Sequence, residues 1–504
     1  MHLTSLSERL RVTFVCRHWR RAFLQHAPLW SQLCLTYKTD ELLLVTLLGH
    51  VKQFPLDITL HYSWSPVPSV ALFSPFVQQI RTLTLHRPRR DDIRNLSTAI
   101  SGSLLLLGTL IIHDTRDVMS SRPLLALTSP LFGGAINVED FYLCTHSSLR
   151  LSLFAFPNLT AFKFETRGDL ERFSASLLLD FLEASPLLQV LDMTIADVIS
   201  YEGVPPDNVL ALPCVTYFRL DITSHTLGWK LATHLSCPSA GYAGFVRRLR
   251  SSYQSHMIPE DIFPPPPLWT AIVHQYPTGT VEEVELELGL ELDKELTCSI
   301  TFWTPRETPL FMQYQHSITP GRSSMDMTWH VVGYCLFSQA CSTIQDHPLL
   351  SNARILRITG GGLLAGNLEL AIIDVGKLWE SMGSLNKLVL RGCDLRPYLD
   401  AFLETPLFPG LALVQLTLFH PIKELTIIHP IQSLWDNEAY AAAIVELAKL
   451  QFAEGVPFEV MTFEPPVPPW VVEKLLLSVN TIQCDQLSPD SDGDQSYSRI
   501  LLPA

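Results

Sequence analysis

The most chemically suggestive segment of the sequence is the glycine run GGGLLAG at residues 360–366, which follows an expected strand. A glycine-rich turn after a strand can cradle a phosphate with its backbone N–H groups. This run lacks the G-K-S/T ending of a P-loop, and its last glycine falls one residue too late for the G-x-G-x-x-G register of a dinucleotide-binding fold. We therefore interpret it as a turn between repeated strands.

Other catalytic motifs are missing from the sequence. It contains no G-x-S-x-G nucleophile elbow, no H-E-x-x-H helix and no kinase H-R-D or D-F-G set. Its 17 histidines sit singly along the chain. We therefore predict no catalytic residue and no cofactor, which implies a protein that is not an enzyme.

The ten cysteines are scattered, and no two of them form a C-x-x-C pair. A zinc site needs closely spaced ligand pairs, because one loop then presents two corners of the tetrahedron. We predict no metal site and interpret the cysteines as reduced, mostly buried residues of an intracellular protein. They are Cys16, Cys34, Cys144, Cys214, Cys237, Cys298, Cys335, Cys341, Cys393 and Cys484.

Two charged clusters are candidates for binding. In the acidic cluster, alternate carboxylates of an extended segment would share one face; a solvated face is the simplest interpretation, followed by a docking surface for a basic partner and then a cation site. The basic cluster lies at a strand end, where an exposed turn is the simplest interpretation and contact with a phosphorylated or acidic motif is the alternative. The acidic cluster comprises Glu282, Glu283, Glu285, Glu287, Glu291, Asp293 and Glu295, and the basic one comprises Arg81, His86, Arg87, Arg89, Arg90 and Arg94.

Composition narrows the class of protein. The chain of 504 residues is 47% apolar and 17% charged, which predicts a folded protein with a large core. A net charge of −14 repels phosphate backbones and argues against nucleic acid as a partner. The longest apolar stretches, at 42–48 and 104–112, are too short to cross a bilayer, and the N-terminus lacks the apolar core of a secretory signal. We expect no membrane association and a cytoplasmic or nuclear location.

An amphipathic helix is expected over residues 6–24. Apolar residues recur there at three- and four-residue steps, while most of the arginines fall off this stripe. Ser5 or Ser7 is a candidate N-cap, and Pro28 marks the end of the helix before Leu29 and Trp30. The stripe comprises Leu6, Leu10, Val12, Val15, Cys16, Trp19, Ala22 and Phe23.

The same segment resembles a known family. The sequence LRVTFVCRHWR at residues 10–20, followed by APLWS at 27–31, is similar to the "LLRVSxVCRxWR…xPxLWS" half of the F-box-like domains common in mushroom-forming fungi. In that family the F-box docks on a Skp-type adaptor, which bridges to a cullin-based ubiquitin ligase. The resemblance is confined to residues 5–35. It implies an adaptor-binding set of Leu10, Val12, Val15, Cys16, Trp19 and Trp30.

The first half of the family pattern, an "LPxEILxxIF" helix that supplies much of the adaptor contact, has no counterpart before this stripe. A three-helix unit without one helix leaves an apolar face open, which costs about 25 cal/mol per Å² in water. We therefore expect either a start further upstream or weak adaptor binding. The alternative is that residues 5–35 merely cap the neighbouring repeats.

Short alternating segments that fit L-x-x-L-x-L, with apolar substitutes, recur through the rest of the chain. Many lie about 27 to 30 residues apart, which matches the longer leucine-rich repeats, and one wider interval leaves room for a further copy near residues 141–143. The segments are 80–85, 107–112, 159–164, 188–193, 215–220, 281–286, 353–358, 385–390 and 413–418. We expect one mostly parallel sheet to contain Leu83, Leu85, Phe162, Phe164, Leu191, Met193, Phe218, Leu220, Leu356, Ile358, Leu388, Leu390, Leu416 and Leu418.

Helices are expected at residues 175–184 and 398–404, each of which precedes a proline and a further strand, and at 437–452. The predicted fold class is therefore α/β: an irregular leucine-rich-repeat solenoid with a mainly parallel curved sheet and convex helices, preceded by a short helical partial F-box. A doubly wound sheet also alternates helix and strand, but its strands usually read as near-continuous Val/Ile runs.

Three parts are predicted along the chain. Residues 1–36 form the partial F-box-like helical segment, 37–485 form the repeat solenoid, and 486–504 form a flexible tail rich in Ser, Asp and Gly. Within the solenoid the repeat signal fades around 223–280, where proline-rich composition suggests an extended, poorly ordered insertion.

These features predict an F-box substrate-recognition subunit of a cullin-based ubiquitin ligase. It would bind a Skp-type adaptor through its N-terminus and an unknown protein target through its repeats. The alternative is a non-catalytic leucine-rich-repeat protein-binding scaffold with a degenerate F-box. An undetected hydrolase or nucleotide-binding enzyme is the least favoured function, because no nucleophile or phosphate motif is present.

Overall fold

The computed structural model divides into two compact units, Met1–Ala240 (unit 1) and Gly241–Ala504 (unit 2). The residues that it describes are 14–36, 39–51, 53–62, 70–88, 92–93, 95–96, 104–113, 137–145, 154, 156–166, 173–195, 199–205, 208–222, 229–250, 283–290, 296–303, 311–319, 353–359, 382, 384–391, 423–428, 438–453, 455, 457–464, 467–487 and 497–503.

Unit 1 is built on a parallel sheet in which neighbouring strands follow one another along the chain, in the order β1-β2-β3-β4-β5-β6-β8-β11. These strands are β1 (Gln32–Leu35), β2 (Leu56–His61), β3 (Ile80–His86), β4 (Thr109–His113), β5 (Asp140–Thr145), β6 (Ala161–Thr166), β8 (Val190–Ile195) and β11 (Tyr217–Ile222). Successive parallel strands of this kind require a crossover segment after each strand.

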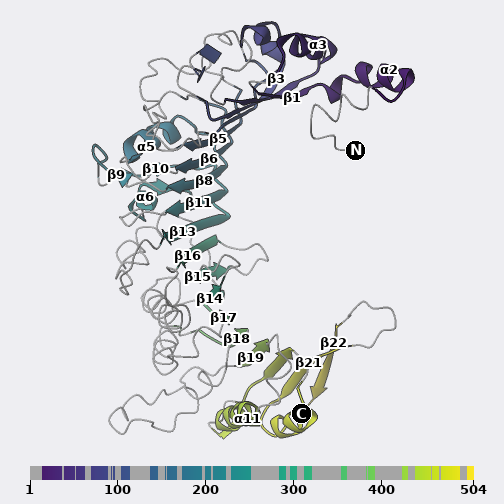
Figure 1. Ribbon diagram of the computed structural model, residues 1–504. Coiled ribbons are helices and arrows are strands. Elements are labelled where there is room, and N and C mark those ends of the chain that lie inside the picture. The colour runs from purple at the N-terminus through teal and green to yellow at the C-terminus, as the bar shows by residue number, and fades with distance from the viewer. Residues whose placement is uncertain are drawn as a thin grey trace. The chain divides into compact units, whose positions relative to one another are not determined.

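The crossover segments of unit 1 contain short helices and strands. They include α3 (Glu41–Val51), η2 (Val70–Gln79), β7 (Phe173–Ser174), α5 (Ala175–Glu183), β9 (Ile199–Ser200) and β10 (Leu210–Ala211). Before β1 the chain forms α2 (Arg17–Gln25) and η1 (Ala27–Leu29), and after β11 it forms α6 (Trp229–Thr233) and β12 (Leu235–Ser236). Two small parallel pairings, β7 with β9 and β10 with β12, lie among them. Helices α5 and α6 lie on the same side of the unit 1 sheet (Figure 1).

The core of unit 1 lies on this helix side of the sheet. Side chains alternate along each strand, so one set in every strand is buried and the other points to the opposite face. A fully buried leucine or phenylalanine stabilises the fold by roughly 1.5 to 3 kcal/mol, which makes the stacked set the main source of stability. The buried set comprises Leu33, Leu35, Ile58, Leu60, Leu83, Leu85, Leu110, Ile112, Phe141, Leu143, Phe162, Phe164, Leu191, Met193, Phe218 and Leu220.

Helix α5 shows how a crossover helix closes this core. It buries Leu178, Phe181 and Leu182 at helical spacing, and the Phe181 ring lies 4.7 Å from the ring of Phe162 in β6. It ends at Glu183, immediately before the turn that contains Pro186. A helix of only nine residues is marginal in water, so its packing on the sheet is what stabilises it.

The same pattern of backbone hydrogen bonds occurs at the start of several strands. Gln189 and Val190 both donate their backbone N–H groups to the carbonyl of Thr160, and Thr216 and Tyr217 both donate to that of Gln189. Unit 2 repeats the pattern, because Asn386 and its successor donate to the carbonyl of Arg354. At these three places the pattern links the start of one strand to the start of the preceding strand, and it occurs in both units.

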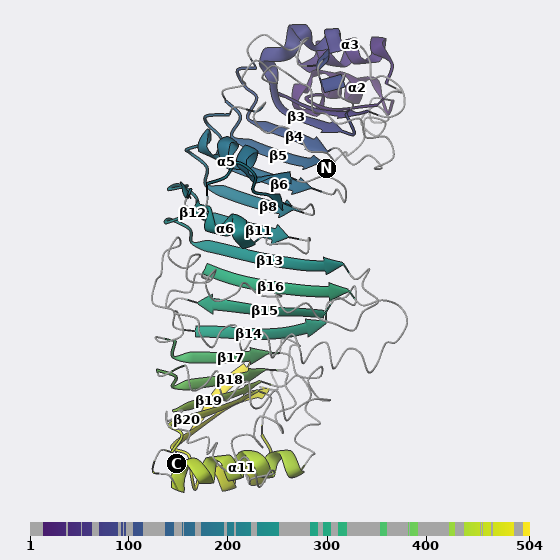
Figure 2. The ribbon, with the colours of Figure 1, turned by 90° about the vertical axis from the view of Figure 1, so that its left-hand side faces the viewer.

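Unit 2 contains a mixed sheet with the strand order β13-β16-β15-β14-β17-β18-β19-β20-β21-β22. The pairs β14–β15, β15–β16 and β21–β22 are antiparallel, and the others are parallel; Figure 2 shows β15 running against its neighbours. The strands are β13 (Tyr242–Arg250), β14 (Glu283–Leu290), β15 (Leu296–Trp303), β16 (Phe311–Thr319), β17 (Ile355–Thr359), β18 (Lys387–Arg391), β19 (Glu424–Ile428), β20 (Val460–Glu464), β21 (Thr481–Leu487) and β22 (Tyr497–Pro503).

Two helices pack against each other in unit 2, α11 (Glu438–Ala453) and α12 (Pro469–Leu475). Helix α11 buries Ala441, Ile444, Leu447 and Ala448, which fall at positions i, i+3, i+6 and i+7 of one helical face. Pro469 occupies the first turn of α12, where a missing backbone N–H breaks no helical hydrogen bond.

The predicted α/β class with a large, mostly parallel sheet is confirmed. The segments at 80–85, 107–112, 159–164, 188–193, 215–220, 281–286, 353–358 and 385–390 contribute strands, and the further copy near 141–143 is β5. The predicted helices at 175–184 and 437–452 correspond to α5 and α11. The strand expected at 413–418, with Leu416 and Leu418, and the helix expected at 398–404 lie outside the described residues.

Three expectations differ from the structure. The helix expected over 6–24 is interrupted at Phe14 and Val15, which form a turn and a bend, and α2 covers only Arg17–Gln25; residues 6–13 lie outside the described residues. Part of the expected insertion at 223–280 is regular, since α6, β12 and β13 lie within it and β13 pairs with β16. The expected tail at 486–504 contains β22, which pairs with β21 through backbone hydrogen bonds that composition does not reveal.

Candidate functional site

Helix α2 begins at an unusual N-cap. Cys16 has the extended backbone typical of that position, and its Sγ accepts the backbone N–H of Trp19 at 3.4 Å. Thiol sulfur is a weak acceptor compared with the oxygen of Ser, Thr or Asp. The start of α2 is therefore held by a weak interaction.

The side chains around α2 form an exposed apolar surface, which we call the N-terminal apolar surface and define as Phe14, Val15 and Trp19. Their exposed fractions are 73%, 69% and 51%, and no residue of α2 is buried. The Trp19 ring lies 5.8 Å from that of Phe23, and the Arg20 guanidinium lies 5.9 Å from the Phe14 ring centroid. Large apolar side chains that stay in water mark a surface available for a partner.

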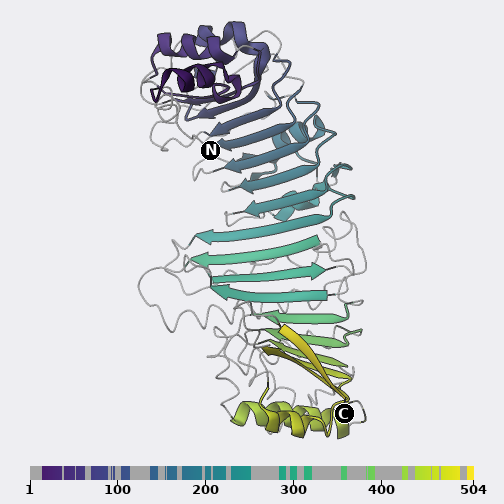
Figure 3. The ribbon, with the colours of Figure 1, turned by 90° about the vertical axis from the view of Figure 1, so that its right-hand side faces the viewer.

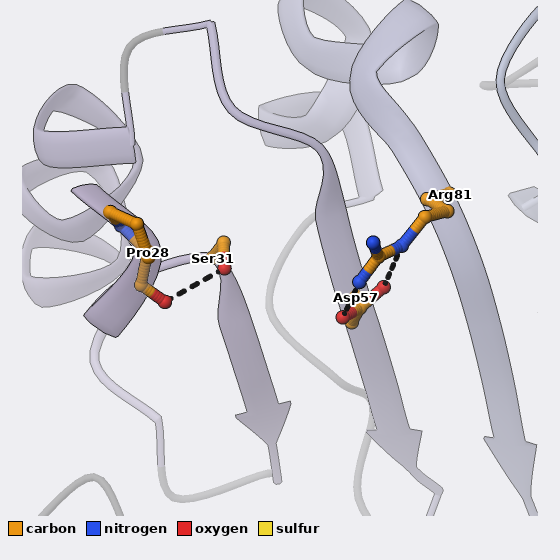
Figure 4. Close-up of polar contacts among 4 residues, drawn as sticks. All are labelled: Pro28, Ser31, Asp57 and Arg81. Atoms are coloured by element: carbon orange, nitrogen blue, oxygen red, sulfur yellow. Dashed lines mark hydrogen bonds and ion pairs between the residues drawn. The ribbon is translucent and has the colours of Figure 1, made fainter.

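Trp30 lies in the opposite environment. Its side chain is fully buried, its indole N–H donates to the carbonyl of Phe23 at 2.8 Å, and its ring lies 6.1 Å from that of His50 in α3. The next residue, Ser31, donates its hydroxyl to the carbonyl of Pro28 at 2.9 Å, which fixes the turn between η1 and β1 (Figure 4). Trp30 thus anchors α2 to the first strand of unit 1.

The predicted adaptor-binding residues therefore separate into two groups. Val15, Cys16 and Trp19 are exposed, while Trp30 belongs to the core. Trp30 lies apart from the exposed residues, because the turn at Pro28 carries it into the core beside β1. Leu10 and Val12 lie outside the described residues.

The second candidate surface is the face of the unit 1 sheet opposite to α5 and α6, which we call the open face. Figure 3 shows the blue and teal strands of this unit in front of those helices, with no helix of the described residues over them. Three histidines, which we call the histidine row, occupy the same register position on it: His61, His86 and His113. The first two rings are stacked at 4.4 Å and the last two at 4.8 Å.

Polar residues continue the open face beyond the histidine row. The edge of the Tyr142 ring meets the His113 ring with a 4.8 Å centroid separation, and the Tyr142 hydroxyl donates to Glu165 at 2.8 Å. Lys163 lies over the other side of Tyr142 at 5.2 Å and within 3.9 Å of Asp192. The carboxylates on β6 and β8 are thus engaged by neighbouring strands.

The protonation of the histidine row is shifted by its surroundings. Burial lowers the pKa of His86 to about 4, and the neighbouring His61, His113 and Arg87 act in the same direction. Burial also lowers the pKa of His61. At neutral pH both rings are therefore uncharged, which is the state that allows close stacking.

The described members of the predicted basic cluster lie at opposite ends of β3. Arg81 lies at the start of β3 and donates two hydrogen bonds to Asp57, at 3.0 and 2.6 Å, which neutralises it (Figure 4). His86 and Arg87 lie at the opposite end of the strand, where Arg87 has a positive φ of 55°. The remaining members lie outside the described residues: Arg89, Arg90 and Arg94.

The predicted acidic cluster is partly described. Arg357 of β17 lies 2.6 Å from Glu283 and 3.8 Å from Glu285 in β14, so these two carboxylates share a cation from the neighbouring strand. The same sheet carries a Lys387–Glu424 pair at 2.8 Å. Glu287 lies in β14, whereas the other members lie outside the described residues: Glu282, Glu291, Asp293 and Glu295.

Other sequence expectations concern metals, cysteines and glycines. Within the described ranges no group of His, Cys, Asp and Glu side chains is suited to hold a metal ion, and no helix there is long and apolar enough to cross a membrane. Cys144 and Cys237 are buried, but Cys16, Cys34 and Cys214 are exposed, so the prediction of mostly buried cysteines was wrong for these three. The glycine run at 360–366 lies outside the described residues.

No family model and no curated protein matches this chain. The resemblance to F-box-like domains therefore rests on residues 10–31 of the sequence.

Proposed function

We propose that this protein is an F-box-type substrate-recognition subunit of a cullin-based ubiquitin ligase, acting in the cytoplasm or nucleus. Helix α2 would dock on a Skp-type adaptor, and the parallel strands would form an irregular leucine-rich-repeat solenoid that holds a protein target. The subunit itself would carry out no chemistry. Ubiquitin transfer would be performed by other members of the complex.

The observation that carries this proposal is the exposure of Phe14, Val15 and Trp19 in the segment that resembles an F-box. Binding energy in protein interfaces concentrates in a few apolar and aromatic anchors, with tryptophan among the most frequent. In a residue pattern that only capped the first strand, Trp19 would be expected to pack inward as Trp30 does. Its 51% exposure favours a partner instead.

The repeat part of the proposal is supported by the strand order and by the recurring backbone hydrogen bonds at strand starts. Unit 1 places each strand beside the next one along the chain, and the strand starts share the paired N–H donation to one carbonyl. Stacked units of this kind bury apolar faces that one unit alone leaves open. Their remaining face offers a broad surface to a protein partner.

The decisive experiment is a calorimetric titration of the 504-residue protein with a Skp-type adaptor. A Phe14→Ala/Trp19→Ala double variant should weaken binding at least tenfold, because it removes two exposed anchors. The matched control is Leu42→Ala, which truncates a residue of α3 that is 77% exposed and lies outside the F-box-like segment. It should leave the affinity unchanged. Absence of adaptor binding by the unmodified protein would refute the proposal.

A non-catalytic scaffold with a degenerate F-box is the second candidate. The observation that favours it is that Trp30 packs inside unit 1, where its ring lies beside His50 and its indole N–H donates to the carbonyl of Phe23. The scaffold would bind its protein target but not the adaptor. The same titration separates the two candidates, because only the first predicts heat on addition of adaptor.

A further inference from the structure

The register of three neighbouring strands produces the histidine row on the open face. The rings of His61, His86 and His113 come from β2, β3 and β4, and each one directly follows a buried residue of its strand. Their separations of 4.4 and 4.8 Å follow the spacing of neighbouring strands in a sheet. All three rings are half-buried, so they lie at the surface rather than in the core.

Each imidazole of this row can donate hydrogen bonds, and its charge depends on whether it is protonated. A neutral imidazole has one N–H donor and one acceptor nitrogen, and a protonated one has two donors. Metal binding is not supported, because no metal-holding group is found among the described side chains, which include these three. The ligand that suits these rings is therefore one that accepts hydrogen bonds and stabilises a positively charged imidazole.

The charges around the row favour the same kind of partner. Arg87 follows His86 directly and adds a fixed positive charge to its surroundings. The carboxylate of Asp57 lies at the other end of β2 and is already paired with Arg81, and Glu165 on β6 accepts the Tyr142 hydroxyl. Asp92 lies near Tyr62, the residue after His61, and burial together with this carboxylate raises the pKa of Tyr62. The positive charge of Arg87 acts on His86, so a negative group would be attracted to the His86 part of this strand end.

We propose that the row of His61, His86 and His113, together with Arg87, binds an acidic segment of a protein partner, and that binding takes up a proton. A carboxylate has two oxygens and can accept N–H groups from two adjacent rings. The inference names the class of target for the open face and in that sense rests on the proposed function, although the binding itself needs no adaptor.

Proton uptake follows from linkage. In the free protein, burial and then the neighbouring His61, His113 and Arg87 lower the pKa of His86 to about 4, so the ring is neutral at physiological pH. A bound carboxylate favours the charged ring and raises that pKa, so affinity increases as pH falls. If the carboxylate restores a pKa of about 6.5, lowering the pH from about 7.5 to about 6 strengthens binding about fourfold. This interval stays above the sequence pI of about 5.6.

The test is a fluorescence-anisotropy titration of the full-length protein with a short labelled peptide of alternating Glu and Ser, at both pH values. We expect saturable binding that strengthens about fourfold on acidification. His86→Gln and His113→Gln should weaken binding and reduce its pH dependence, because glutamine keeps a hydrogen-bonding group but cannot take up a proton. The matched control is His26→Gln, which removes an exposed histidine after α2 and should change neither quantity.

A copy of the peptide with Gln in place of Glu should not bind. Equal binding of this neutral copy, pH-independent affinity, or unchanged binding by both histidine variants would each overturn the proposal. The titration contains no adaptor, so its result is independent of the F-box test. Peptide binding without adaptor binding would refute the ligase function and retain the acidic-segment site.

Discussion

Trp19 and Trp30 come from one short sequence motif but have opposite surroundings, which yields a residue-level prediction. Trp30→Ala should lower the free energy of unfolding of unit 1 by about 3 to 5 kcal/mol, because the indole is fully buried and hydrogen bonded. Trp19→Ala should change it by less than about 1 kcal/mol, because that ring is half in water. Urea unfolding followed by circular dichroism measures both. Equal losses would contradict the separate roles.

His86 yields a prediction of how stability depends on pH. Its pKa is lowered to about 4 in the folded protein from 6.5 in an unfolded chain, so the unfolded state takes up the proton first. Folding stability should therefore fall as the pH is lowered from about 6.5 toward about 4. The loss should reach about 1 kcal/mol by pH 5 once solvent screening of the half-buried ring is allowed for.

The matched variant for this measurement is His86→Gln, which has no titrating ring at that position. Its urea midpoint should decline less between about pH 7 and about pH 5 than that of the unmodified protein. An identical decline would show that other groups govern the pH dependence.

The two candidate surfaces differ in how far the sequence could predict them. The sequence pointed to Val15, Cys16 and Trp19 because neighbouring residues of one short segment form the F-box-like motif. The histidine row was missed, because its members are far apart in the sequence and only strand register brings them together. A signal existed nonetheless: each histidine directly follows the last buried residue of its strand, at the same position of three successive strands.

At the element scale, the start of α2 can be strengthened. Cys16→Ser should stabilise the first turn by about 0.5 to 1 kcal/mol, because a hydroxyl oxygen is a better acceptor for the Trp19 N–H than a thiol at 3.4 Å. Hydrogen exchange in a peptide spanning Arg17–Gln25 should slow by about two- to fivefold.

The control for this prediction is Cys16→Ala, which has no acceptor at the N-cap and should exchange faster than the unmodified protein. Equal exchange in the serine and alanine variants would show that the cap does not limit the opening of α2.

The strands and helices also show where local sequence suffices. Alternating apolar residues predicted β3, β6, β8 and β11, and a proline after an apolar stripe predicted the end of α5. The reversal of β15 between β14 and β16 was not predicted. Alternation indicates that a segment is a strand and which side it buries, but pairing direction is set by the connection between strands, which periodicity does not contain.

At the scale of the whole molecule, the chain divides into two compact units. In unit 1, Phe162 is fully buried between Phe141 and Phe181, with ring separations of 5.6 and 4.7 Å. In unit 2, Phe463 of β20 is fully buried. Truncation of either ring leaves a cavity that its own unit must accommodate, because packing contacts are short-ranged.

The expected result is a pair of calorimetric transitions that respond independently to Phe162→Ala and Phe463→Ala. Each substitution should cost about 3 to 5 kcal/mol in its own unit and lower one transition by several degrees, while the other stays in place. The double variant should show both shifts, since distant sites without shared partners are additive. A single transition displaced by either substitution would mean that the parallel strands of both units unfold as one cooperative array, as short stacked repeats can.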